Sequence, residues 1–157
     1  MDTLLIVGGG PVSEVLAPMA ELLGWQTRSV TSLGDALAVL PDASAVVVTS
    51  HHDDVDGPVL AAALESDIGY VAAMGSRRTQ ERRRTWLSES GVSAAEQSRI
   101  HGPAGLDIGA DSPPEIAVSI LAELVSTVRG GAAGSIKDRP GPIHPELAPG
   151  EAYCPEG

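Results

Sequence analysis

Short apolar runs and longer stretches with helical periodicity alternate along the chain from residue 3 to about residue 128. Leucine, isoleucine, valine and alanine fill most of these runs without polar alternation, which is typical of strands buried on both faces. The expected strands cover residues 4–7, 25–30, 45–49, 69–74 and 100–101, and the second is the weakest of them. The expected helices cover residues 13–23, 33–40, 58–64, 77–88 and 113–128.

Strands that alternate with helices predict a parallel sheet with helices on both faces. We therefore expect an α/β fold of the Rossmann-like, doubly wound kind, with a mostly parallel sheet of about five strands in the order 3-2-1-4-5. The last helix has the clearest start, because Ser112 and Glu115 have the spacing of a capping box. Residues 129–157 contain six glycines and five prolines without a period. This composition predicts a folded domain over 1–129 and a Gly/Pro-rich tail over 130–157.

Composition narrows the possible functions. The 157 residues are enough for one domain, and the net charge of −11 argues against binding to nucleic acid or to an anionic membrane surface. No apolar run reaches the length of a membrane span, and the first residues lack a basic segment, so we expect a cytoplasmic protein. Cys154 is the single cysteine, which excludes a disulfide within one chain and a zinc site built from cysteines.

The segment Gly8–Ser13 fits the pattern G-x-G-x-x-[G/A/S] between a strand and a helix. Gly8 permits a tight turn, Gly10 lets a phosphate approach the backbone, and the helix that begins near Pro11 and Val12 offers free N–H groups to an anion. The alternative is a tight turn that binds nothing.

Dinucleotide sites usually carry an acidic residue at the end of the second strand, where it binds the ribose hydroxyls. Here Thr31 and Ser32 occupy that place, and Asp35 follows a little late. Ordinary NAD binding is therefore disfavoured. Arg28 favours a 2′-phosphate, unless it is only a surface residue.

Ser50, His51 and His52 follow the third strand, and three aspartates follow them. Histidine and aspartate are metal ligands, but adjacent residues point in different directions on an extended chain. A polar loop with a helix-capping aspartate is the preferred interpretation, and no metal site is predicted.

The turn Met74–Thr79 follows the fourth strand. Gly75 lets the backbone approach a ligand, Ser76 can cap the next helix, and Arg77 or Arg78 can bind a phosphate through two hydrogen bonds. In the expected strand order this turn lies beside the glycine turn. Five of the nine arginines fall between residues 77 and 84, and the last three of these are interpreted as a solvated helix face.

The segment Ile100–Gly109 contains three glycines and one proline, which describes a loop of defined shape. It carries His101 and Asp107. Such loops often bind ligands, although a connector in which Asp107 satisfies backbone N–H groups explains the pattern equally well.

Taken together, these segments resemble the C-terminal Rossmann-like domain of the xanthine dehydrogenase accessory protein family (XdhC/CoxI). Four blocks carry the resemblance, in order, over roughly residues 4–128: the glycine turn Leu4–Ser13, the block Ser50–Pro58, the turn Met74–Thr79 and the segment Arg99–Glu123. The last two are specific, because G-S-R-R-T followed by I-H-x-P-x-G-L-D-I-G is not a general feature of Rossmann folds.

The resemblance implies a maturation factor that binds the molybdenum cofactor and helps to insert it into xanthine or carbon monoxide dehydrogenase-type enzymes. It implies a cleft for a nucleotide or a phosphorylated pterin, with Gly8 and Gly10 near a phosphate and Arg77 or Arg78 paired with it. His51, His101 and Asp107 would line the rim. We expect an accessory protein more than a catalyst, with a molybdenum hydroxylase as its client.

Two departures from the family pattern bear on this interpretation. Family members carry a cysteine-bearing N-terminal domain, so a separate accessory subunit is an expected partner. The acidic residue after the second strand is replaced by Thr31 and Ser32. Two alternatives stay open: an NAD(P)-dependent oxidoreductase, and a nucleotide-sensing or oligomerising module without catalysis. An apolar patch on the helices would favour the last, and burying such a patch normally gives a symmetric dimer. We expect the protein to be a homodimer.

Overall fold

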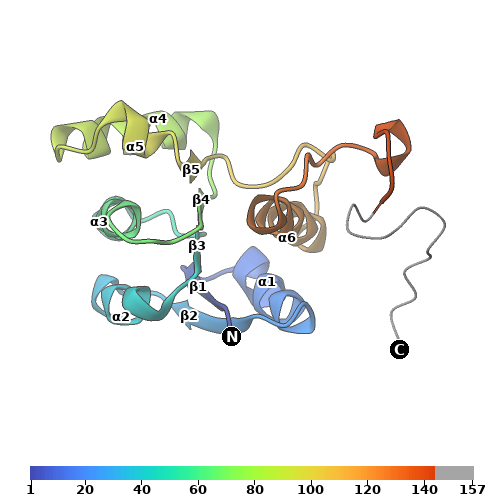
Figure 1. Ribbon diagram of the computed structural model, residues 1–157. Helices are drawn as coiled ribbons and strands as arrows, with labels where there is room; N and C mark the ends of the chain where they lie inside the picture. The colour runs from blue at the N-terminus through green and yellow to red at the C-terminus, as the bar shows by residue number, and fades with distance from the viewer. Residues whose placement is uncertain (144–157) are drawn as a thin grey trace.

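The computed structural model describes residues 1–143, and Cys154 lies outside this range. Figure 1 shows a single sheet seen along its edge, with helices in a layer on each side. The strands are β1 (Thr3–Val7), β2 (Gln26–Val30), β3 (Ala45–Val48), β4 (Tyr70–Ala73) and β5 (Ile100–His101). The helices are α1 (Pro11–Leu22), α2 (Leu33–Val39), α3 (Asp53–Leu64), α4 (Arg77–Glu89), α5 (Ala94–Gln97) and α6 (Pro113–Arg129), with 3₁₀ turns at Leu40–Asp42 and Ile136–Asp138.

All five strands are parallel, so the α/β doubly wound fold is confirmed. Their order is β2-β1-β3-β4-β5, and the predicted order 3-2-1-4-5 is wrong. Burial explains the difference. All four residues of β3 are buried, whereas β2 exposes Gln26, Arg28 and Ser29. A strand without polar residues belongs inside the sheet, and a strand with three exposed polar residues belongs at its edge.

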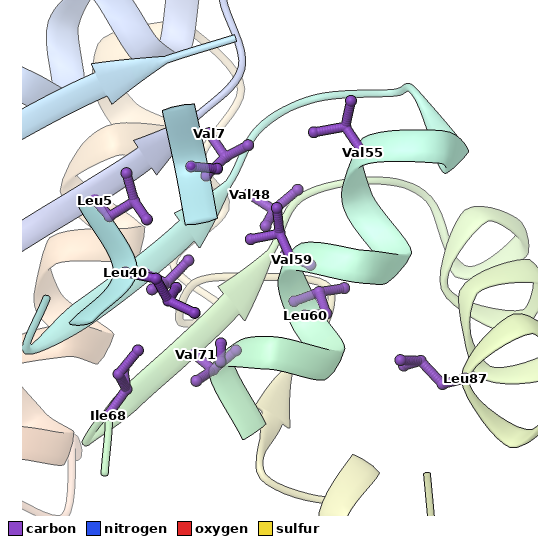
Figure 2. Packing of buried hydrophobic residues seen from close by; sticks show 14 residues of the cluster. Leu5, Val7, Leu40, Val48, Val55, Val59, Leu60, Ile68, Val71 and Leu87 are labelled. Carbon is purple, nitrogen blue, oxygen red and sulfur yellow. The ribbon is translucent and has the colours of Figure 1, made fainter. Parts of the chain in front are cut away.

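Alternate residues of the central strands build two separate cores. Leu5, Val7, Val48 and Val71 face α2, α3 and α4, and Figure 2 shows how Val59, Leu60 and Leu87 pack towards them. Leu4, Ile6, Val47 and Tyr70 face the other way, onto α1 and α6. Two layers of helices around one sheet therefore bury the apolar runs on both sides, as their uninterrupted pattern predicts.

Several helix boundaries differ from the prediction. The third helix begins at Asp53 and contains Pro58, instead of starting at that proline, and α5 was not predicted at all. Pro18 lies inside α1, although an interior proline disfavours a helix. The capping box of Ser112 and Glu115 at the start of α6 is confirmed, and Gly130 ends that helix in the left-handed conformation. No helix within residues 1–143 is long and apolar enough to cross a membrane.

Candidate functional site at the carboxyl edge of the sheet

The carboxyl ends of β1, β3 and β4 lie side by side and each leads into a turn and a helix. Thr49 N–H donates to the Val7 carbonyl at 2.8 Å, and Met74 N–H donates to the Val48 carbonyl at 2.8 Å, so the three turns start at one level. The strand order reverses between β1 and β3, because β2 lies on one side of β1 while β3, β4 and β5 follow on the other. Ligands of open α/β sheets bind at such a point.

The glycine turn has one closed position and two open ones. A Cβ on Gly8 would lie 2.5 Å from both the Ser50 nitrogen and the Thr49 hydroxyl, so only glycine fits this contact between β1 and β3. A Cβ on Gly9 or Gly10 would meet nothing within 4 Å. The backbone of Gly9 and Gly10 is therefore accessible to a ligand.

The start of α1 has the features of an anion site. Its N-cap is Gly10, with φ of 109°, and no side chain caps the helix. Pro11 has no N–H, so the first free N–H groups of the helix are those of Val12 and Ser13. The Ser13 hydroxyl is buried and lies 2.6 Å from the hydroxyl of Thr49, which anchors the helix against the end of β3. The residues present thus fit a phosphate, held by backbone N–H groups and the helix dipole.

The turn after β3 faces the glycine turn across the switch point. Ser50 is buried and its hydroxyl accepts a hydrogen bond from His52 N–H at 3.1 Å, whereas His51 is exposed. Asp53, Asp54 and Asp56 all belong to the first turn of α3, where negative charge complements the helix dipole. Within residues 1–143, no group of three or more histidine, cysteine, aspartate or glutamate side chains is arranged to hold a metal ion.

Arg83, on the buried face of α4, connects the turns after β3 and β4 through hydrogen bonds. Its guanidinium donates to the carbonyls of Ser50 and Met74 and to the carboxylate of Asp56. The side chain is 3% exposed, so the interpretation of Arg83 as part of a solvated face is wrong. The signal was present in the sequence: Gln80, Arg83 and Leu87 are spaced as one face of a helix, and that face is buried.

The turn after β4 carries the two arginines of the predicted phosphate clamp. Ser76 caps α4, because its hydroxyl accepts from Thr79 N–H at 3.2 Å, and Arg77 and Arg78 are exposed at the first two helical positions. The prediction that this turn is the direct neighbour of the glycine turn is wrong, since β3 lies between β1 and β4. Two strand spacings, roughly 10 Å, separate the ends of β1 and β4. A ligand that touches both turns must extend across the end of β3.

The loop after β5 crosses the α6 side of the sheet. Its Leu106 N–H donates to the Ser119 carbonyl at 3.2 Å, and the Ser119 hydroxyl donates to the Leu106 carbonyl at 2.6 Å. Asp107 is exposed on this loop. The ring of His101 lies against that of Tyr70, with centroids 4.9 Å apart. His101 is thus held beside α6, while Asp107 is open to solvent.

Glu123 of α6 holds this loop in place and was not expected from the sequence. Its carboxylate accepts from the Tyr70 hydroxyl at 2.8 Å and from Gly105 N–H at 2.9 Å, and lies 3.5 Å from His101 Nδ1. Burial raises the pKa of Glu123, but the hydrogen bonds from His101, Gly105 and Tyr70 outweigh it and lower the pKa below its ordinary value. Burial and the same carboxylate raise the pKa of Tyr70 strongly. Glu123 is therefore a charged acceptor at neutral pH.

The late acidic residue after β2 is engaged with its own helix. The Asp35 carboxylate accepts from the Ser32 hydroxyl at 2.8 Å, and the same hydroxyl accepts from Asp35 N–H at 3.1 Å. These bonds form the cap of α2. Asp35 is thus a capping partner, and Thr31 and Ser32 stand where a ribose-binding acid is usually found.

Comparison with known proteins places this edge in context. The family model described as the XdhC Rossmann domain matches residues 4–124. The "Molybdenum cofactor insertion chaperone PaoD" of Escherichia coli (strain K12) is 32% identical over 124 residues, which are 78% of this chain and 39% of that protein. The "Uncharacterized protein YqeB" of the same organism is 28% identical over 161 residues, which are 87% of this chain and 29% of that protein.

A solved structure has the same fold. The crystal structure of a xanthine dehydrogenase from Bacillus halodurans superposes with a TM-score of 0.64 and 27% sequence identity, over 86% of this chain and 45% of that one. The chain thus spans less than half the length of each of these relatives.

Proposed function

The chain belongs to the XdhC Rossmann-domain family, and on that premise we propose that it is the ligand-binding module of a maturation factor for molybdenum hydroxylases. Its ligand is a phosphorylated pterin, the molybdenum cofactor, or a related nucleotide. The name of the insertion chaperone PaoD, a relative over most of this chain, supports the cofactor as cargo. A molybdenum hydroxylase is then the client that receives it, and a separate accessory subunit is a further partner.

The open, uncapped start of α1 is the observation that carries the proposal. A phosphate placed there receives the N–H groups of Val12 and Ser13 and meets no side chain at Gly9 or Gly10. Next to this phosphate position, Gly8 lets the ends of β1 and β3 stay in close contact. The missing ribose-binding acid suits a pterin phosphate better than a nicotinamide dinucleotide.

The neighbouring turns add contacts beyond the phosphate. His51 is exposed directly across the switch point, and Arg77 and Arg78 lie one strand further along. A ligand with a ring system or a second anionic group beyond its phosphate spans this distance. Arg83 holds the turns after β3 and β4 together through hydrogen bonds to the carbonyls of Ser50 and Met74.

Thermal unfolding of the full chain with added ligands tests this proposal. The ligands are extracted molybdenum cofactor, AMP, CMP, NAD and NADP, each at a concentration series. A ligand at about 100 times its Kd stabilises the native state by about 2.7 kcal/mol, which raises the Tm by several degrees. We expect the largest rise with the pterin, a smaller one in Arg77→Ala, and an unchanged one in Arg84→Ala, which removes another exposed arginine of the same helix.

Other outcomes contradict the proposal in different ways. A rise with NAD or NADP alone would favour a nicotinamide-dependent protein. No rise with any ligand would indicate that the glycine turn is only a turn. If Arg77→Ala left the ligand-induced increase in Tm unchanged, the protein would still bind the ligand, but Arg77 would not be part of the binding site.

A further inference from the structure

An apolar groove is lined by α1 and α6, together with Leu106 and the segment Gly131–Gly134 that follows α6. These two helices cover the face of the sheet opposite α3 and α4 (Figure 1). The groove has a volume of about 650 Å³, and apolar side chains of both helices line it, among them Met19, Leu22, Leu23, Val118, Leu121 and Val125. A second hollow of about 390 Å³ shares Leu23 and Val125 with the first and continues to Arg129. The two form one continuous surface along both helices, which we call the α1–α6 face.

The apolar side chains of this face are exposed to an unusual degree. Leu22 is 88% exposed and Leu23 is 54% exposed, and on α6 the exposures of Val118, Val125 and Val128 lie between 42% and 47%. Contiguous apolar surface of this kind marks an interaction site.

The exposed side of α6 has the spacing of a helix that packs against another helix. Val118, Ala122 and Val125 follow one another at intervals of four and three residues on this side, which is the a/d spacing of a helical pair. Ala122 lies in the middle of this seam, where a small side chain allows close approach. A helix is therefore the element that fits the face.

The charges at the two ends of α6 indicate which helix packs against this face. The outer side of α6 carries Glu115 near its start and Arg129 at its end. If two copies of α6 pack antiparallel about an axis near Ala122, Glu115 of each copy lies beside Arg129 of the other. We propose that the α1–α6 face binds a second copy of this chain, as a symmetric dimer with α6 against α6 at its centre. The two-fold axis makes the contact between Glu115 and Arg129 form twice, so the surface is self-complementary.

Sedimentation equilibrium of the full chain over a range of concentrations tests the dimer. We expect a reversible dimer, and we expect Val125→Glu to raise its dissociation constant at least about tenfold, because a carboxylate then lies in the apolar seam of each copy. Leu37→Glu is the matched control. Leu37 is 41% exposed but belongs to α2, on the opposite side of the sheet, so this variant should dimerise like the parent.

A mixing experiment tests the antiparallel arrangement itself. Arg129→Glu brings two glutamates together at each contact, and Glu115→Arg brings two arginines together, so each variant alone should dimerise more weakly. An equimolar mixture restores both opposite-charge contacts, and we expect dimers to reappear as the heterodimer. Circular dichroism of each variant confirms that it is folded, since Glu115→Arg also removes half of a capping box.

Three results would overturn the proposal. They are a monomer at every concentration, a dimer that Val125→Glu leaves intact, and a mixture that dimerises no better than its components. A monomer at every concentration would mean that the α1–α6 face binds something other than a second copy, either another protein or residues of this chain beyond 143. The second would place the dimer contact elsewhere, and the third would exclude the antiparallel pair. None of these readings depends on the ligand site at the carboxyl edge.

Discussion

The guanidinium Nη2 of Arg83 lies 2.8 Å from the carboxylate Oδ2 of Asp56, and both side chains are withdrawn from solvent, with exposures of 3% and 0%. The pair connects α4 to α3, and Arg83 also binds the backbone of the turns after β3 and β4. A single buried cation thereby supports two of the three turns at the candidate site.

Asp56→Asn should destabilise the protein by about 3 to 5 kcal/mol, because it leaves the Arg83 charge buried without its counter-ion. Urea unfolding measures the change in the free energy of unfolding. Asp53→Asn is the matched control, since Asp53 pairs with Arg82 at 2.9 Å where both side chains are 52% exposed. The control should change stability by less than about 1 kcal/mol. Equal losses in the two variants would show that burial of the Arg83 pair has no special role.

Gly8→Ala should cost about 2 to 4 kcal/mol. The added methyl group would lie 2.5 Å from backbone and side-chain atoms of the turn after β3, and the φ of 127° is strained for alanine. Gly9→Ala has open space and should lie within about 1 kcal/mol of the parent. Thermal unfolding of both variants checks the contrast. A stable Gly8→Ala protein would mean that β1 and β3 are further apart at this point.

Glu123→Gln should lower stability by about 1 kcal/mol at pH 7, because a neutral amide accepts hydrogen bonds from Tyr70 and Gly105 less strongly than a carboxylate does. The pKa of Glu123 is lowered in the folded protein, so its stabilising effect exists above the ordinary carboxyl pKa of about 4.3 and is lost as the pH falls through the folded value. The Tm difference between parent and variant should therefore be full at pH 7 and shrink below about pH 4. A difference that stays constant down to pH 3 would contradict this account.

Ser112→Ala should cost about 1 kcal/mol, since the hydroxyl caps the start of α6 by accepting from Glu115 N–H. Chemical unfolding measures the loss. Ser126 near the other end of α6 donates to the Gly131 carbonyl at 2.7 Å, and Ser126→Ala serves as a comparison that leaves the N-terminal cap intact. If the two losses were equal, the capping box would contribute nothing specific.

Pattern and periodicity were sufficient to predict all five strands and five of the helices. Most of these elements have uninterrupted apolar runs or a clear helical stripe, so their burial follows directly from composition; the polar β2 is the exception. The four-residue α5 was missed because Ala94–Gln97 has no buried residue and so no periodic signal. Its capping box of Ser93 and Glu96 was the one cue available.

The predicted strand order 3-2-1-4-5 was wrong, because it follows the common Rossmann order and not the composition of the strands. The polar β2 and the apolar β3 already favoured an outer and an inner place. Arg83 and Glu123 were missed for a different reason. Arg83 lies on the face that its spacing with Gln80 and Leu87 marks as buried, but its counter-ion Asp56 lies on another helix. Only the partners of Glu123, among them Tyr70, show that its carboxylate is turned inward. Partners distant in sequence cannot be found from periodicity.

The two outer strands of the sheet have a consequence for behaviour at high concentration. An exposed strand edge is a template on which other chains can add strands and grow into aggregates. Here one edge, β5, is only two residues long, and the other, β2, carries Gln26, Arg28 and Ser29 towards solvent. Both edges are poor templates, so the protein is protected from edge-to-edge aggregation even though its central strands are among the most β-prone segments of the chain.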